Sequence, residues 1–343
     1  WLEDTAYGLQ DRYDRLRHGG DSPKTYWVVP QEHGPQKSDD GGKNQLSSAV
    51  LAFPPAAARV PYSSVANAGD GVWSQVNGTA DSNGRALLAK TMIHPDPGRA
   101  YTVLAIVAMD VKGISLHAVP GTVEPKDNSL PPEKRPGKVP ASESSSLLAA
   151  FNGGFLTIHG YYGMMVDGHR LLDPQQSSCT LAIYRDSTIR IRTWTEIAST
   201  EPEMLAFRQT PLCLAESGKI HPTLTNAYNT NWGAAVGGNT VLRRSAIGIS
   251  ADGSVLYFGM GDSLTARSLA EGMLAAGAHD VAQLDVNHAF PRFVFFGKSS
   301  NGEVAAVAPL CPGFNFDPLD YVTTPMRRDF FYVTRRASAI PPS

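Results

Sequence analysis

The stretch FNGGFLTIHGYYGMMVDGHRLL, residues 151–172, joins apolar segments that we expect to form buried strands. A plain connection between strands in a compact domain is usually about 4–6 residues long. This one is longer and carries an asparagine, two adjacent glycines, a histidine and two tyrosines. We therefore expect a function, and not chain reversal alone, to set its composition.

Hairpin signals extend outward from this stretch in both directions. Short turns join apolar or alternating runs at four places: Asp110–Gly113, Asp167-Gly168, Arg185–Ser187 and Ala251–Gly253. Asp-Gly suits the positive φ of a tight hairpin turn, and alternation over four to eight residues is typical of strands. Sequential hairpins with few helices predict an α+β fold, with a mixed or antiparallel sheet packed by a few helices.

One helix is predicted from Thr265 to about Ala276. Leu269, Met273 and Ala276 fall on one face, and Gly277 stands where a left-handed C-terminal cap belongs. The helix feeds into HDVAQLDVN, which we expect to form a short strand that ends near Asp285.

Composition divides the chain into three parts. Residues 1–65 mix Gly, Pro, Asp and Lys with little periodicity, which predicts a loosely ordered N-terminal arm. Residues 66–336 are expected to form the main folded domain, and 337–343 a tail. Within the domain, residues 120–146 are rich in Pro and Ser, as in a linker or a long surface loop.

The totals limit the class of protein. The 343 residues are 42% hydrophobic and 18% charged, which is globular composition, and the net charge of -2 gives no attraction to nucleic acid. No apolar run approaches the roughly 18 residues of a transmembrane segment. The sequence begins at Trp1 rather than Met, so we expect a trimmed or mature chain. Of the three cysteines, buried thiols are the favoured interpretation, and one disulfide is the alternative.

The first candidate site follows LLAAF. Asn152 precedes Gly153 and Gly154, which free the backbone to turn sharply and let a ligand approach closely. The alternative is a strained turn in which the asparagine tolerates positive φ. His159 is a candidate general acid or anion ligand, although a histidine beside aromatic residues is often a packed, hydrogen-bonded side chain.

Two further places carry polar groups at strand ends. Arg244 precedes the strand SAIGI and can grip a carboxylate or phosphate with two parallel bonds, with Arg208 as a second candidate. The alternative for such an arginine is a surface salt bridge. Asp285 follows VAQL and is a candidate base, nucleophile or metal ligand, with Asn287 and His288 close behind. The alternative is a turn-capping aspartate before Pro291.

Four segments together resemble the phosphodiester glycosidase family: FNGGFL, GYYGMMVDG, RSAIGISADG and SLAEGMLAAGAHDVAQLDVN. They occur in the family's order, from about Ala149 to Asn287. The family typically follows its aspartate with a Gly-rich, Ser-containing turn, whereas Asp285 is followed by VNHAFPRF. A divergent, bacterial-type branch of the family is similar in carrying an asparagine two residues after this aspartate.

The resemblance implies a hydrolase that cleaves a sugar-1-phosphodiester or a related envelope or extracellular glycan. Asp285 would be the base or nucleophile and His159 a candidate acid, while Asn152 and the Gly153-Gly154 backbone would fix the sugar. Arg244 and Arg208 would hold the phosphate. The tyrosines Tyr161 and Tyr162 would provide stacking surfaces, and Asn287 and His288 would border the same pocket.

Two alternatives accompany this prediction. One is a non-catalytic glycan-binding or envelope-structural protein on the same fold, which the altered turn after Asp285 permits. The other is a metal-dependent glycan hydrolase with Ca²⁺ or Mg²⁺ on Asp285, Asn287 and His288; otherwise no cofactor is expected. The expected location is secreted, periplasmic or in the cell envelope, with a carbohydrate or sugar-phosphate as the partner.

Overall fold

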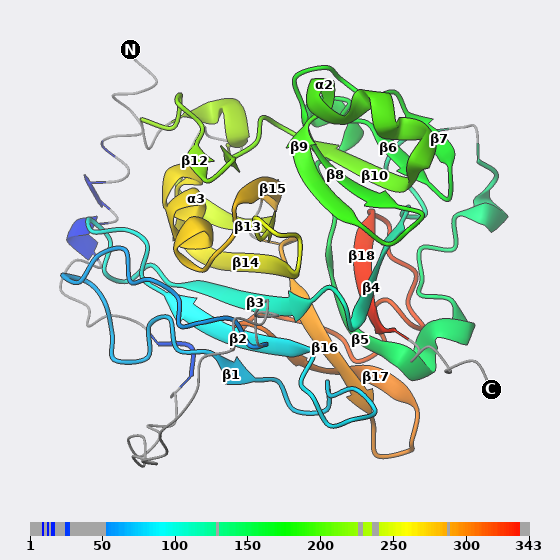
Figure 1. Ribbon diagram of the computed structural model, residues 1–343, viewed down its shortest axis with the longest axis horizontal. Helices are drawn as coiled ribbons and strands as arrows, with labels where there is room; N and C mark the ends of the chain where they lie inside the picture. Colours follow the sequence, from blue (N-terminus) through cyan, green and yellow to red (C-terminus); the bar gives the residue numbers. More distant parts are fainter. Residues whose placement is uncertain are drawn as a thin grey trace, which may run out of the picture.

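The computed structural model describes residues 9, 12–13, 15–17, 25–27, 53–127, 130–225, 229–234, 240–286 and 289–336. Three antiparallel sheets with few helices make up this part of the chain, as Figure 1 shows, so the α+β prediction is confirmed at the level of class. Most of the predicted N-terminal arm and the predicted tail lie outside the described residues. No helix in the described ranges is long and apolar enough to cross a membrane.

The first sheet has eight strands. In spatial order they are β1 (Ser74–Gln75), β2 (Leu88–Ile93), β3 (Leu104–Asp110), β14 (Val255–Leu264), β13 (Leu242–Ile249), β15 (Asp280–Val286), β11 (Ala215–Glu216) and β12 (Lys219–Ile220). Helix α3 (Ala266–Ala275) packs on β13, β14 and β15 (Figure 1). Its start is fixed by a capping box between Thr265 and Ser268, and Gly277 follows it with φ +112°.

The second sheet has five strands and contains two of the predicted hairpins. Its order is β7 (His169–Leu172), β6 (Met164–Val166), β10 (Met204–Thr210), β8 (Cys179–Tyr184) and β9 (Ile189–Thr193). The β6–β7 pair turns at Asp167-Gly168 and the β8–β9 pair at 185–187, as predicted. Between β9 and β10 lie α2 (Trp194–Ile197) and the 3-10 helix η4 (Ala198–Glu203).

The third sheet also has five strands, in the order β17 (Val304–Pro309), β16 (Phe293–Lys298), β5 (Leu147–Asn152), β18 (Phe330–Arg335) and β4 (Ile114–Val119). The predicted hairpin between 104–110 and 114–119 is wrong, because β3 pairs with β2 and β14 while β4 pairs with β18. The turn at 110–113 therefore carries the chain from one sheet to another. By contrast, β13 and β14 form the predicted hairpin around 251–253.

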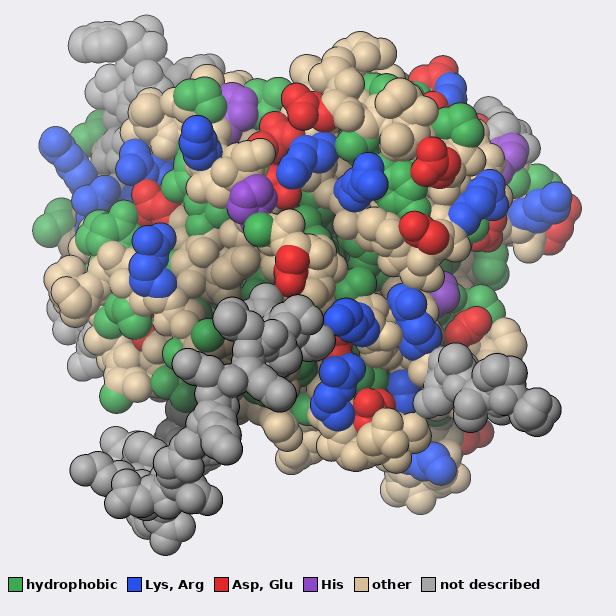
Figure 2. All heavy atoms as spheres, in the orientation of Figure 1, with side chains coloured by type: hydrophobic (Ala, Val, Ile, Leu, Met, Phe, Trp, Pro, Cys, Tyr) green, Lys and Arg blue, Asp and Glu red, His purple; other side chains and the backbone are tan. Residues whose placement is uncertain are grey.

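One hydrophobic core joins the three sheets. Leu88 of β2, Leu181 of β8 and Phe151 of β5 belong to the same cluster of buried side chains. Phe151 stacks on Phe293 at 5.6 Å and on Phe331 at 5.5 Å between ring centroids. On the outside, basic and acidic side chains are interspersed over the face shown in Figure 2.

The described part of residues 120–146 lies between β4 and β5, two strands of the third sheet. The described part of this loop includes the 3-10 helices η1 (Pro132–Lys134) and η2 (Ala141–Ser146). Arg135 is buried and donates from Nε to the carbonyl of Gly121, from Nη1 to Asp127 and from Nη2 to Pro125. The guanidinium thus satisfies three backbone carbonyls of the loop, in addition to the backbone hydrogen bonds that the loop makes.

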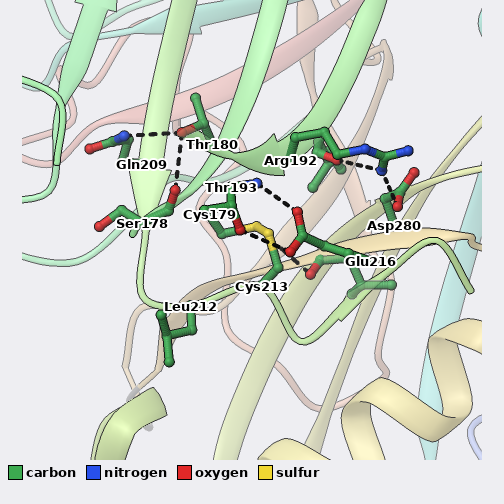
Figure 3. The surroundings of a disulfide bond; sticks show 12 residues. Ser178, Cys179, Thr180, Arg192, Thr193, Gln209, Leu212, Cys213, Glu216 and Asp280 are labelled. Carbon is green, nitrogen blue, oxygen red and sulfur yellow. Dashed lines mark hydrogen bonds and ion pairs between the residues drawn. A yellow bond between two sulfur atoms is a disulfide. The ribbon is translucent and has the colours of Figure 1, made fainter. Parts of the chain in front are cut away.

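A disulfide between Cys179 and Cys213 ties the second sheet to the first (Figure 3). Cys179 begins β8, and Cys213 lies just before β11. Beside it, Thr193 donates from its amide and its hydroxyl to the two carboxylate oxygens of Glu216, at 2.7 and 2.8 Å. The favoured prediction of buried thiols is therefore wrong for this pair and holds for Cys311, which is buried and outside the disulfide.

Candidate functional site

A cavity of about 270 Å³ lies where β5, β15 and the segment before β18 meet. The residues that line it include Asn152, Gly153, Gly154, Asp285, Arg328 and Asp329. The first four are predicted site residues that come from two different sheets, separated by more than 130 positions in sequence. The structure therefore brings the asparagine, the glycine pair and the aspartate to one place.

Asn152 fixes the relative positions of the two strands that carry the site. Its Nδ2 donates to Ser245 Oγ at 3.0 Å and to the carbonyl of Gly153 at 3.1 Å. Ser245 in turn donates to the backbone carbonyl of Asp285 at 3.1 Å. Since Asn152 Oδ1 accepts from the amide of Arg292, the whole side-chain amide is engaged in holding the backbone.

Glycine is required at both positions because the side chains of other residues occupy the space that a Cβ would need. A Cβ on Gly153 would lie 2.1 Å from Asp329 Oδ2, and one on Gly154 would lie 2.7 Å from Arg208 Cζ. The amide of Gly154 donates to Asp329 Oδ2 at 2.9 Å, while the amide of Asp285 donates to the carbonyl of Gly153 at 3.1 Å. Close backbone approach is thus the reason for this glycine pair.

Asp285 is a carboxylate held in a largely dry environment. It is 4% exposed, and burial raises its pKa to about 7, although Arg328 and the amide of Val286 both act to lower it. Oδ1 accepts from that amide at 2.9 Å. A carboxyl group with such a pKa exchanges protons near neutral pH, which is typical of groups in catalytic sites.

Arg328 is the cation closest to this carboxylate. Its Nη2 lies 2.5 Å from Asp285 Oδ2, and its guanidinium carbon lies 4.0 Å from the centre of the Phe290 ring. The ion pair lacks hydrogen-bond geometry, so Oδ2 has no hydrogen-bond partner among the described residues. Oδ2 is thus a buried oxygen that contacts the Arg328 guanidinium and lacks a hydrogen bond from the described residues.

Arg208 lies behind the glycine turn and is 1% exposed. Nε and Nη2 donate to the carboxylate of Asp329, at 2.9 and 3.3 Å. The other donors go to the backbone carbonyls of Tyr162, Gln209 and Phe155. All five N–H donors are in use, so in this arrangement Arg208 positions the turn, and its predicted role as a phosphate ligand would require breaking these bonds.

Arg244 is also fully buried and fully hydrogen-bonded. Its five donors reach the side chain of Gln283 and four backbone carbonyls, those of Trp232, Gly233, Thr240 and Leu264. Burial lowers its pKa. Since its neighbour Ser245 contacts Asn152, Arg244 lies next to the site, but it does not line the cavity. Its role as a phosphate ligand stays a prediction, with this geometry against it.

Three more predicted residues, His159, Tyr161 and Tyr162, lie elsewhere. His159 ends the short 3-10 helix η3 (Thr157–His159) and is exposed, and Tyr161 is 62% exposed with φ 52°. Tyr162 packs edge-on against Phe155 at 5.8 Å. None of the three lines the cavity around Asp285. Asn287 and His288 lie outside the described residues, and the rest contain no group of three or more side chains suited to a metal ion.

Two residues of the site, Arg328 and Asp329, were missed by the sequence analysis. Both precede the apolar strand FFYV and are separated from Asp285 by more than 40 positions. The available signal was the charged run Arg327–Asp329 directly before a buried strand, because strand ends on a rigid sheet are common places for sites.

The chain is similar in sequence to one protein family and in structure to several solved proteins. The sequence profile of the phosphodiester glycosidases matches residues 145–285. The catalytic domain of zebrafish N-acetylglucosamine-1-phosphodiester alpha-N-acetylglucosaminidase, auto-inhibited by its pro-peptide, is similar over 77% of this chain and 88% of its own, with 14% identity and a TM-score of 0.46. A hypothetical protein from Synechocystis is similar over 73% and 62%, with 10% identity and a TM-score of 0.44. No curated protein matches the sequence.

Proposed function

We propose that this protein, whose residues 145–285 match the sequence profile of the phosphodiester glycosidases, is a hydrolase that cleaves a sugar-1-phosphodiester or a related extracellular glycan bond. The observation that carries the proposal is the environment of Asp285. Its carboxylate lines a cavity, has a pKa raised to about 7 by burial, and keeps one oxygen without a hydrogen bond from the described residues.

The proposed chemistry needs one proton-transfer group and one cation. A phosphate is a good leaving group at an anomeric carbon, so cleavage depends less on protonation than it does for an ordinary glycoside. Asp285 would attack the anomeric carbon or activate the water that does so. Arg328 would be the cation that faces the phosphate, because its guanidinium contacts Asp285 and lines the same cavity.

Three other residues would position these groups. Asn152 and Ser245 connect the turn after β5 to the backbone of Asp285. Asp329 accepts from Gly154 and is neutralised by Arg208. We assign them positioning roles because their polar atoms are occupied by protein partners, which leaves Asp285 and Arg328 as the groups to meet the substrate.

A glycan-binding protein without turnover is the second candidate, and one observation favours it. Glycosidases commonly use two carboxyl groups around the scissile bond. In this cavity the other two carboxylates, Asp329 and Asp320, are paired with Arg208 and Arg292 at 2.9 and 2.8 Å. Only Asp285 combines a raised pKa with an oxygen that lacks a hydrogen bond among the described residues.

The experiment that tests the proposal is hydrolysis of a substrate panel. Purified protein is incubated with sugar-1-phosphodiesters, including UDP-N-acetylglucosamine, and with aryl glycosides, and the reducing sugar released is measured. We expect turnover of the diesters that falls at least about 10²-fold in Asp285→Asn. Asp173→Asn, which changes an exposed carboxylate, is the matched control. Sugar binding by a folded protein that turns over neither set would support the second candidate and overturn the first.

We also propose a secreted, periplasmic or envelope location. The Cys179–Cys213 disulfide supports it, because such bonds persist in oxidising compartments. Alkylation of free thiols in protein recovered without reductant tests this. One blocked thiol, at Cys311, is expected, whereas three would count against an oxidising location.

A further inference from the structure

A second and larger cavity, of about 470 Å³, lies away from Asp285 and shares no lining residue with the first. Strands β4 and β18 form one wall, β8, β10 and the β6–β7 turn form another, and the described part of the loop 120–146 covers it. The volume is in the range of small-molecule sites. The Pro-rich loop, which the proposed hydrolysis does not use, therefore contributes one boundary of this cavity.

The floor of this cavity is a stacked pair of rings. His117 and Tyr332 lie 4.4 Å apart between ring centroids with an angle of 7° between their planes. His117 is fixed in this position by Thr334, whose Oγ1 lies 3.0 Å from Nε2. The side chain of Tyr332 is only 4% exposed, but its hydroxyl, which makes no hydrogen bond to a described residue, is not one of the fully buried polar atoms and keeps contact with solvent. A ligand in the cavity can therefore bond this hydroxyl without displacing a described protein partner.

Two lysines of the covering loop supply positive charge. Lys134 and Lys138 both line the cavity, and neither has an ion-pair or hydrogen-bond partner for its ammonium group among the described residues. They sit four positions apart on a loop that Arg135 holds in place. One carboxylate, that of Asp167, also lines the cavity and is exposed. The lysines therefore leave a net positive charge for a ligand to neutralise.

The rest of the lining is mostly apolar. It includes Leu116, Val119, Pro120, Leu130, Pro136 and Ile183. A polyhydroxylated ligand would make few apolar contacts with these side chains, and inorganic phosphate would leave most of the volume unfilled. The combination of an aromatic floor, apolar walls and two unpaired lysines selects a molecule with an apolar body and an acidic group.

We propose that this second cavity binds a small organic anion, a carboxylate, sulfonate or phosphate carried on an aromatic or aliphatic body. The body would lie over His117 and between the apolar walls, and the acidic group would pair with Lys134 and Lys138. The Tyr332 hydroxyl would donate to a polar atom of the ligand. The proposal is independent of the hydrolysis at Asp285, because the two cavities have no residue in common.

The test uses two fluorescent probes that differ by one charged group. 1-Anilinonaphthalene-8-sulfonate carries the anion, and N-phenyl-1-naphthylamine is its neutral counterpart. We expect the folded protein to bind one sulfonate probe per chain. In the double variant Lys134→Gln/Lys138→Gln, the sulfonate dissociation constant should rise about tenfold, while that of the neutral probe changes less than twofold.

Two further variants keep the proposal falsifiable. Lys112→Gln/Lys219→Gln removes the same charge from exposed positions outside the cavity and should leave both constants unchanged. Tyr332→Phe should weaken binding of the sulfonate probe. The variant should unfold at the same denaturant concentration as the wild type, because the hydroxyl makes no hydrogen bond to a described residue. The proposal is overturned if the wild type fails to bind the sulfonate, if both lysine pairs weaken it equally, or if neither pair does.

Discussion

At the scale of single residues, the site depends on the carboxyl group of Asp285, whose charged form is disfavoured by burial. Asp285 is buried beside one arginine, and burial outweighs that arginine in setting the pKa. The position of Asp285 was predictable, because an aspartate at the end of an apolar strand is visible in the sequence. Its counter-ion was not, because nothing in the local pattern shows that Arg328 folds back onto it.

Asp285→Asn should remove a pH dependence of stability. The unfolded chain loses this proton near pH 4 and the folded protein near pH 7. Stability from the protonated carboxyl is thus present below about pH 4 and lost as the pH rises to 7. The free energy of unfolding of the variant, relative to wild type, should therefore increase by about 1–4 kcal/mol from pH 4 to pH 8. Urea unfolding at both pH values measures it, and parallel profiles would contradict it.

Arg328→Gln should move the titration of Asp285 upward. The guanidinium lowers this pKa against the effect of burial, so its removal should raise the apparent pKa above 7. The pH dependence of hydrolysis, or carbon NMR of the aspartate carboxyls, reports the change. Arg327→Gln, an exposed neighbour that lines the same cavity, is the control. An unchanged titration in both variants would mean that the Arg328 ion pair is absent in solution.

At the scale of elements, the turn after β5 is shaped by what lies behind it. Gly154→Ala should destabilise the protein by about 1–3 kcal/mol, because its Cβ would meet the buried guanidinium of Arg208 at 2.7 Å. Gly297→Ala is the control, since its Cβ meets only Val307 side-chain atoms at 3.3 Å or more. Urea unfolding of both variants compares them. Equal stability would show that the turn can shift away from Arg208.

The disulfide is the second element-scale feature with a measurable effect. Replacing Cys179 and Cys213 by alanine opens a loop whose ends are 34 positions apart, which corresponds to about 3–4 kcal/mol of chain entropy. Cys311→Ala removes a buried sulfur without opening a loop and should cost about 1 kcal/mol. Urea denaturation of the two variants gives both values, and denaturation of the wild type with reductant measures the loss of the disulfide a second time. A wild type unaffected by reductant would contradict the prediction.

Local sequence patterns predicted where the strands lie better than they predicted which strands pair with each other. The β6–β7, β8–β9 and β13–β14 hairpins were found because each turn is short and its strands pair directly. The β3–β4 turn has the same appearance, yet its strands enter different sheets. A turn sequence indicates that the chain reverses, but it does not determine with which distant strand each arm pairs. Periodicity alone therefore could not distinguish a true hairpin from a turn between two sheets.

At the scale of the whole molecule, the three sheets share one core. We therefore expect residues 66–336 to unfold in a single transition. Leu88, Leu181 and Phe151 belong to different sheets but to the same buried cluster. Tryptophan fluorescence and far-ultraviolet circular dichroism should give coincident urea curves. Two separate midpoints would contradict the prediction of one catalytic domain over these residues.

The site as a whole was only partly predictable for a related reason. The glycine turn and Asp285 follow apolar strands and were recognisable, while Arg208 and Arg244 were expected to face a phosphate. In the structure the donors of both guanidiniums are occupied by protein acceptors, and their role as phosphate ligands stays a prediction. A sequence shows that an arginine is present, but the carbonyls that occupy its donors come from segments brought together by the fold.

The pairing of β5 has a practical consequence for recombinant expression. This strand lies between β16 and β18, both of which follow residue 285 in the chain. A fragment cut to residues 145–285 would therefore expose both edges of an apolar strand, and open edges recruit other strands. Such a fragment should accumulate as insoluble aggregate, and it would carry Asp285 without Arg328. Boundaries chosen for protein production should accordingly extend at least to residue 336.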